Sequence, residues 1–250
     1  MTDGAPKRPE RLQKAPIVEA LIDIHVEPVL SQLEELAAFE TLAGSEFPER
    51  KRVIQLMSNL DLSNEEPKMT ASAAEVKGYA FWTADKRRVV QARLDGFSCS
   101  HLASYDCWKS LRTDTQEWWK KFCETTKVTH VKRYAVRYIN RIELPLPMKD
   151  FGEYLRTLPR VAEGLPQSLS GIFMRLVIPF NDATVIVTQA IDEAGVTPVK
   201  IPIILDIDVS QTGSVPVDGD DLWNKLETLR EIKNDVFFKS LTPTAWRLFE

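Results

Sequence analysis

The order of the predicted elements occurs twice along this chain of 250 residues, and this repetition constrains the fold more than any other feature. The first half is predicted to contain a strand at 16–26, a helix at 32–44, three strands within 52–62 and 78–102, and a helix at 105–126. The second half is predicted to contain a strand at 131–144, a short helix at 148–158, strands at 168–180, 183–191 and 201–210, and a helix from about Asp220. Residue identities do not repeat, so the shared order can also arise by chance.

Local signals define several of these boundaries. Ser31 and Glu34 form a capping-box pattern at the start of the first helix, and Gly44 ends that helix. A hairpin turn is predicted at residues 85–86. The polar segment 63–77 is predicted to be a loop.

The predicted fold class is therefore α+β. We expect a flexible N-terminal arm at 1–14 and two similar halves, 15–128 and 129–250, that form one compact unit. Each half would be an antiparallel sheet with helices on one face. If the repetition is a duplication, the halves join about a pseudo-two-fold axis, by analogy with the saddle of the TATA-binding-protein class. Fold analogy alone carries no function.

Composition narrows the class of protein. Hydrophobic residues make up 44% and charged residues 27%, which is typical of a globular chain. The net charge of -4 argues against a dedicated nucleic-acid binder. No apolar run is long enough for a membrane helix, and the first fifteen residues lack the apolar core of a secretory signal. Three cysteines are an odd number, which favours reduced thiols and predicts a cytoplasmic location.

Three arginines stand four residues apart in the segment RYAVRYINRIELP. On a strand, Arg133, Arg137 and Arg141, hereafter the arginine row, project from one face. They could bind phosphates or an acidic partner, for which the planar guanidinium group is suited. The alternative is a cross-strand ion-pair ladder, which would use Asp206 and Asp208 or Glu19 and Asp23. We favour the ladder, because ion-pair networks are common structural features.

Polar residues of the last predicted helix extend this candidate anionic site. Arg230, Lys233 and Asn234 follow helical spacing and lie along one side of the helix. Together with the arginine row they could frame one concave site for a small anionic ligand. A solvated helix face is the alternative, and we favour it because polar helix faces need no special role.

Metal and cofactor motifs are weak. Asp206 and Asp208 share a strand face and could hold magnesium, but no Gly-Ser turn for a phosphate precedes them. Cys99, His101 and Cys107 fall close together without the spacing of a zinc site. Glycine-rich nucleotide-binding motifs are absent. The sequence therefore predicts no cofactor and no catalytic residue.

Aromatic residues are the main candidates for binding a partner. Trp118 and Trp119 are adjacent on a helix, so both cannot lie at the centre of one buried stripe, and one should be partly exposed. The chain ends in an aromatic tail, FFKSLTPTAWRLFE. This tail either docks on the body or offers an apolar patch to a partner. The candidate partner-binding residues are Trp119, Phe238, Trp246 and Phe249.

Four segments resemble, in order, a sporadically distributed prokaryotic family of about this length. They are APIVEALIDIHV near the start, RYINRIELP, LDIDV, and the closing LRxxKNDVFFKSLT from Leu229 to Thr242. The resemblance extends from about residue 15 to the end. The family has no established function and implies no catalytic residues. The resemblance implies a prokaryotic protein, and sporadic distribution is typical of defence or toxin–antitoxin genes.

Three functions remain open at this stage. The first is a non-enzymatic binding or accessory protein that recognises a protein partner. The second is a sensor or enzyme for an anionic small molecule such as a nucleotide, with Asp206 and Asp208 as a weak alternative metal site. The third is a saddle-shaped nucleic-acid binder, against which the acidic net charge counts. Self-association is left open, and no membrane association is predicted.

Overall fold

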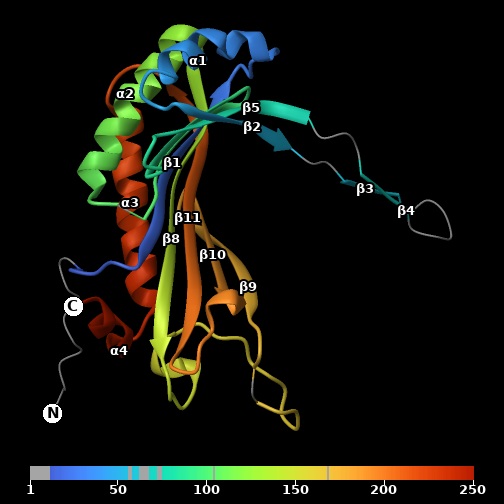
Figure 1. Ribbon diagram of the computed structural model, residues 1–250, viewed down its shortest axis with the longest axis vertical. Coiled ribbons are helices and arrows are strands. Elements are labelled where there is room, and N and C mark those ends of the chain that lie inside the picture. The colour runs from blue at the N-terminus through green and yellow to red at the C-terminus, as the bar shows by residue number, and fades with distance from the viewer. Residues whose placement is uncertain (1–11, 56–57, 62–67, 72–74, 104, 168) are drawn as a thin grey trace. The chain divides into compact units, whose positions relative to one another are not determined.

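The computed structural model is an α+β protein, as predicted, and describes residues 12–55, 58–61, 68–71, 75–103, 105–167 and 169–250. Nine strands form an antiparallel sheet in the order β2-β5-β6-β7-β1-β8-β11-β10-β9, and β3 and β4 pair separately (Figure 1). The chain divides into two compact units. The N-terminal unit comprises Ile22–Arg133 and Gly213–Gly219, and the C-terminal unit comprises Met1–Leu21, Tyr134–Thr212 and Asp220–Glu250.

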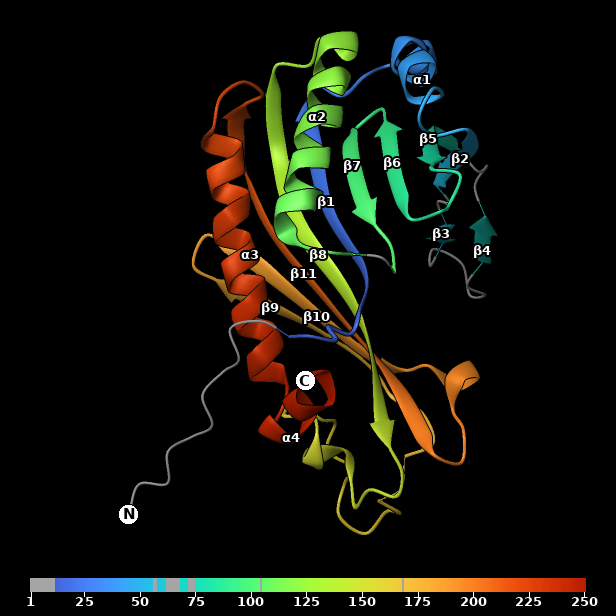
Figure 2. The same ribbon diagram turned by 60° about the vertical axis from the view of Figure 1, so that its left-hand side comes forward.

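The N-terminal unit contains most of the strands of the first half. Its elements are most of β1 (Ile17–Glu27), η1 (Leu33–Leu36), α1 (Ala37–Ala43), β2 (Glu49–Gln55), β3 (Ser58–Asp61), β4 (Lys68–Ala71), β5 (Glu75–Trp82), β6 (Arg88–Arg93), β7 (Gly96–His101), α2 (Trp108–Thr126) and the start of β8 (His130–Pro145). Figure 2 shows α2 running lengthwise along β1 and β7.

Aromatic rings form the core of the N-terminal unit. The ring of Phe39 on α1 lies 6.0 Å from Phe81, 6.1 Å from Phe97, 5.9 Å from Trp118 and 5.9 Å from Phe122, with edge-to-face geometry in each case. Edge-to-face pairs add attraction beyond the area they bury. Phe39 therefore joins α1, α2 and the sheet in one core.

The expectation that Trp118 or Trp119 is exposed is wrong. The exposed fractions are 2% for Trp118 and 3% for Trp119. Trp118 packs 5.0 Å from Phe47, just after α1, whereas Trp119 packs 6.0 Å from Phe97 on β7. Both rings are buried because α2 contacts a helix on one side and the sheet on the other, which widens its buried face beyond a single stripe.

Three local predictions for the N-terminal unit also need correction. The segment 78–102 contains three strands, not two, because a second turn at Leu94 and Asp95 separates β6 from β7. The capping box uses Glu35 instead of Glu34, and its carboxylate accepts hydrogen bonds from the backbone N–H groups of Ser31 at 2.8 Å and Gln32 at 2.9 Å. Within the predicted loop 63–77, β4 pairs with β3.

The C-terminal unit places one long helix on one face of its strands (Figure 2). Its elements are the rest of β8, η2 (Phe151–Glu153), β9 (Phe173–Phe180), β10 (Ala183–Ile191), η3 (Glu193–Gly195), most of β11 (Lys200–Pro216), α3 (Asp221–Ser240), α4 (Pro243–Trp246) and η4 (Arg247–Phe249). The predicted strand at 183–191 is confirmed, since β10 begins and ends at the same residues. The predicted helix at 148–158 is wrong, since only the single turn η2 forms between Pro147 and Pro159.

Strict alternation separates the two faces of this unit's sheet. Buried residues on β11 include Ile203, Leu205, Ile207 and Val209, and Asp206 and Asp208 lie between them on the opposite face. Lys233 of α3 lies 3.4 Å from the centre of the Tyr138 ring on β8, so α3 covers the face that carries Tyr138. We call the opposite face, which carries Arg137 and Asp206, the open face.

The predicted N-terminal arm, 1–14, falls largely outside the described residues. At its end, Lys14 donates from its backbone N–H to the carbonyl oxygen of Phe249 at 2.9 Å and from Nζ to Glu250 at 2.8 Å. Residues near both ends of the chain therefore lie together in the C-terminal unit. The predicted halves, 15–128 and 129–250, remain a prediction, and the two compact units divide the chain differently.

Candidate functional site

In the C-terminal unit, two members of the arginine row, Arg137 and Arg141, pair with acidic side chains. Arg137 forms a two-pronged contact with Asp206, from Nε to Oδ1 at 2.9 Å and from Nη2 to Oδ2 at 2.6 Å. Arg141 contacts Asp192 at 3.0 Å and Glu143 at 2.6 Å. The hydrogen bonds that Arg137 donates to Asp206 raise the pKa of Arg137, so its guanidinium stays charged. The predicted ion-pair ladder is therefore present at Arg137.

Arg133 belongs to a separate charged cluster in the N-terminal unit. Asp23 accepts from Arg133 at 3.0 Å and from Arg93 at 2.7 Å, and His25 lies 3.0 Å from Asp23 and 3.4 Å from Asp95. We call these five residues the His25 cluster. Hydrogen bonds to Asp23 and then Asp95 raise the pKa of His25 from 6.5 to about 9, so the ring is protonated at neutral pH.

The pKa values of the two carboxylates in the His25 cluster are lowered, whereas that of His25 is raised. Burial raises the pKa of Asp23, but the hydrogen bond from His25 and the charge of Arg93 outweigh it and hold that pKa well below its usual range. The hydrogen bond from His25 lowers the pKa of Asp95 to about 2. The cluster thus contains three cations and two anions that satisfy one another. A protonated His25 is unsuited to act as a general base.

The last helix does not join the arginine row in one site. Lys233 is 7% exposed, contacts the Tyr138 ring and donates from Nζ to Asn234 Oδ1 at 2.8 Å. Tyr138 and Arg137 are neighbours on β8 and project from opposite faces. The predicted concave site that combines Arg230, Lys233 and Asn234 with the arginine row is therefore wrong, because the sheet lies between the two groups. Arg230 pairs with Glu227 at 2.5 Å.

The weak alternative magnesium site is occupied by protein contacts. Both oxygens of Asp206 accept from Arg137, at 2.9 and 2.6 Å, which leaves little of that carboxylate for a metal ion. Among the described residues, no group of three or more His, Cys, Asp or Glu side chains is arranged to hold a metal ion. The three cysteines are free thiols, and burial raises the pKa of Cys99 to about 12.

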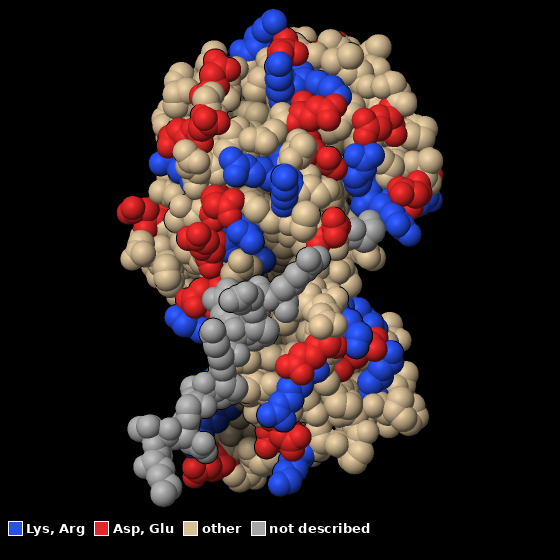
Figure 3. All heavy atoms as spheres, turned by 90° about the vertical axis from the view of Figure 1, so that its left-hand side faces the viewer, with Lys and Arg blue, Asp and Glu red and all other residues tan. Residues whose placement is uncertain are grey.

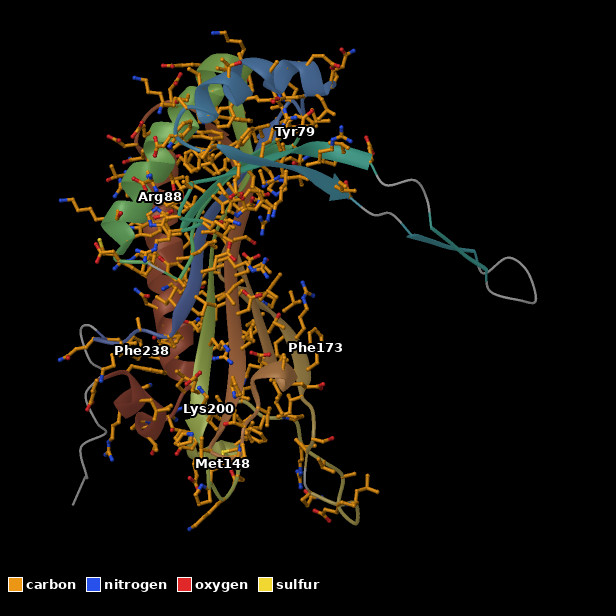
Figure 4. All side chains as sticks on the ribbon, in the orientation of Figure 1. Tyr79, Arg88, Met148, Phe173, Lys200 and Phe238 are labelled. Carbon is orange, nitrogen blue, oxygen red and sulfur yellow. The ribbon has the colours of Figure 1, made fainter. Side chains whose placement is uncertain are left out.

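The aromatic tail docks on the C-terminal unit. Phe249 is 4% exposed, and its ring lies 6.1 Å from Phe237 of α3. Phe238 and Trp246 pair edge to face at 5.7 Å, and both are half-buried (Figure 4 labels Phe238). Thr242 caps α4 and donates from Oγ1 to the carbonyl oxygen of Glu153 at 2.6 Å. Of the four candidate partner-binding residues, Trp119 and Phe249 are thus core residues, and only Phe238 and Trp246 keep exposed surface.

Four exposed apolar side chains lie on one strand, β9, which we did not select from the sequence as a candidate site. On β9, the exposed fractions are 78% for Phe173, 54% for Val177, 40% for Ile178 and 36% for Phe180. Figure 4 labels Phe173. Within the described part of the chain, this strand pairs with β10 alone and forms one edge of the sheet. The sequence feature that could have identified β9 as an edge strand was Pro179, because proline within a strand pattern indicates an edge strand.

Two comparisons with known proteins were negative. No family model matches this chain, and no curated protein matches it. No helix among the described residues is long and apolar enough to cross a membrane. The function must therefore be inferred from the geometry alone.

The backbone of β9 can form hydrogen bonds outwards. The N–H of Ile191 donates to the carbonyl of Ile172 at 3.0 Å, and the register with β10 is regular from Phe173 to Phe180. In an antiparallel ladder, every second residue of a strand forms backbone hydrogen bonds with the same neighbouring strand. Because Ile172 bonds to β10, the even-numbered residues of β9 direct their backbone groups towards β10. The odd-numbered residues, including Arg175 and Val177, direct their backbone groups away from the sheet.

Proposed function

We propose that this protein is a non-enzymatic binding protein that holds an extended segment of a protein partner against β9. The observation that carries the proposal is an edge strand with exposed apolar side chains and outward backbone groups. Proteins usually protect such edges with charge, and an exposed apolar edge is suited to strand addition. The other edge strand, β2, illustrates that protection with the run Glu49–Arg52, which is charged at every position.

The side chains of β9 specify the partner's chemistry. Phe173, Arg175 and Val177 project from the open face. Arg175 is exposed and forms no ion pair with another described residue. A complementary segment would therefore place an acidic residue opposite Arg175 and apolar residues on either side, in the pattern apolar-x-acidic-x-apolar. Pro179 offers no outward N–H and limits pairing to the first part of the strand.

Two alternative functions have less support. An anionic small molecule on the arginine row would have to displace Asp206 from Arg137 and Asp192 from Arg141. A nucleic acid would require a face dominated by positive charge, whereas lysine and arginine are interspersed with acidic residues on the face in Figure 3. A defence or toxin–antitoxin setting, the prokaryotic cytoplasm and a duplicated saddle remain predictions. The matching strand orders β7-β6-β5 and β11-β10-β9, each beginning beside β1 or β8, support the duplication.

The test is to select, from a displayed library of random peptides, those that bind the full-length chain. We expect enriched peptides to show the apolar-x-acidic-x-apolar pattern. The variant Val177→Pro removes an outward N–H without breaking a β9–β10 hydrogen bond, and should weaken these peptides at least tenfold. Val177→Thr keeps the N–H group and the branched shape, and should weaken them much less. Thermal melts check that each variant is folded.

A second variant keeps the proposal testable if Val177→Pro does not fold. Arg175→Glu should change the selected pattern from acidic to basic at the central position. Failure to enrich any pattern, or equal binding to wild type and Arg175→Glu, would overturn the proposal. Dimerisation of the wild type that Val177→Pro abolishes would also overturn it, because the edge would then belong to a second copy.

A further inference from the structure

A groove in the C-terminal unit has the size and lining of a small-molecule site. Its volume is about 620 Å³, within the usual range for ligand pockets. The apolar lining comes from the chain that follows β8 and from the start of β11, and includes Leu146, Met148, Phe151, Leu158, Val161 and Ile201 (Figure 4 labels Met148). Much of this lining is half-exposed, so apolar surface remains uncovered in the groove.

The charged groups of the groove are two cations and one carboxylate, and the amide of the polar lining residue Gln167 donates to the carbonyl oxygens of Ala162 at 3.3 Å and Leu165 at 2.8 Å. The carboxylate of Asp150 accepts a hydrogen bond from the backbone N–H of Gly152 at 2.5 Å. This hydrogen bond caps η2. Lys149 lines the groove, and its ammonium forms no hydrogen bond or ion pair with a described residue. Arg160 contacts Glu163 at 3.4 Å, but both side chains are almost fully exposed, so this contact is weak. The groove therefore favours a negative group.

Behind Leu158 and Pro159, the interior of the unit has no room for part of a ligand. Leu158 and Pro159 also line a second cavity of about 10 Å³, enough for one water molecule. Gln189 lines that cavity, is 2% exposed, and its Oε1 is buried without a hydrogen-bond partner among the described residues. A single water would satisfy this amide, so a ligand must occupy the groove itself.

From these observations we infer that the groove binds a small amphipathic carboxylate, an aliphatic chain that ends in a carboxylate group. The chain would lie against Met148, Phe151 and Val161, and the carboxylate would lie between Lys149 and Arg160. This site is independent of the proposed β9 edge, because no residue of β9 lines the groove.

The test uses decanoate and the uncharged analogue decanol as probes on the full chain. We expect decanoate to bind and to shift amide NMR signals of the groove residues. The double variant Lys149→Gln/Arg160→Gln should weaken decanoate at least fivefold and leave decanol within twofold. Lys225→Gln/Lys239→Gln, a matched loss of two charges on α3, should change neither ligand.

Val161→Asp places a carboxylate in the groove and should weaken both ligands at least fivefold. Because Val161 is half-exposed in a connecting segment, we expect this variant to fold. The inference would be overturned if decanoate does not bind the wild type. It would equally be overturned if decanoate binds Val161→Asp and the Lys149→Gln/Arg160→Gln variant as well as it binds the wild type, which indicates detergent-like binding elsewhere.

Discussion

At the scale of single residues, Arg137 and Asp206 differ in what each loses when its partner is removed. The Asp206 side chain is 14% exposed, whereas that of Arg137 is 42% exposed. Without Arg137, Asp206 would be a largely buried carboxylate near the second carboxylate of Asp208. Without Asp206, Arg137 could be hydrated. An isolated buried charge is costly, whereas an exposed one is not.

We therefore predict that Arg137→Ala destabilises the protein more than Asp206→Ala does. The expected losses in unfolding free energy are roughly 2 and about 1 kcal/mol, and the double variant should lose less than their sum. Urea denaturation of the two single variants and the double variant measures all three values. Additive losses would show that the pair is not coupled. A larger loss for Asp206→Ala would contradict the argument from burial.

The His25 cluster predicts a pH dependence of stability. The folded protein raises the pKa of His25 from 6.5 to about 9, so the folded state binds the proton more tightly than the unfolded chain does. This contribution is fully present below pH 6.5 and is lost as the pH rises through about 9. The melting temperature of the wild type should therefore fall between these values. His25→Gln should flatten that slope, and His130→Gln, at an exposed position, should not. An unchanged slope in His25→Gln would contradict the assignment.

At the scale of elements, close approach of two strands fixes the position of Gly96. A Cβ atom at this position would overlap the carbonyl oxygen of Ile24 on β1, and backbone atoms cannot move away cheaply. Gly213, on β11, is exposed, and a Cβ atom added there would meet no other atom within 4 Å. The same substitution should therefore have opposite consequences at the two positions.

We predict that Gly96→Ala lowers the unfolding free energy by about 3 kcal/mol, because it forces β7 away from β1. In a chain of this size the loss corresponds to a fall of roughly 10 °C in melting temperature. Gly213→Ala should leave the melting temperature within a few degrees or raise it slightly. Thermal melts followed by circular dichroism check both values. An unaffected Gly96→Ala would show that the two strands can separate without cost.

The elements also show where sequence reasoning succeeded. Strand β8 was predicted because tyrosine, valine and isoleucine dominate its sequence, and β10 contains a run of β-branched residues. The turn between β6 and β7 was missed although Asp95-Gly96 is a common hairpin signal. The burial of Trp119 and the exposure of Phe173 could not be predicted, since each depends on which neighbouring element packs beside it. The pairing of Arg137 with Asp206 was predicted because both lie on strands with matching alternation.

At the scale of the whole molecule, three strands connect the two compact units. β1, β8 and β11 each contribute residues to both units, so the chain crosses the boundary within continuous strands. Units joined by a flexible linker can unfold independently. Here, one unit could unfold only if the hydrogen-bonded ladders of these strands were interrupted partway along their length.

We therefore predict that both units unfold in one cooperative transition. Native-state hydrogen exchange in increasing urea should give the same opening free energy and the same urea dependence for buried amides of β6, in the N-terminal unit, and of β10, in the C-terminal unit. Amides at the β9 edge should exchange faster, because their outward N–H groups have no partner in the sheet. Two separate opening energies for β6 and β10 would show that the shared strands break at the boundary.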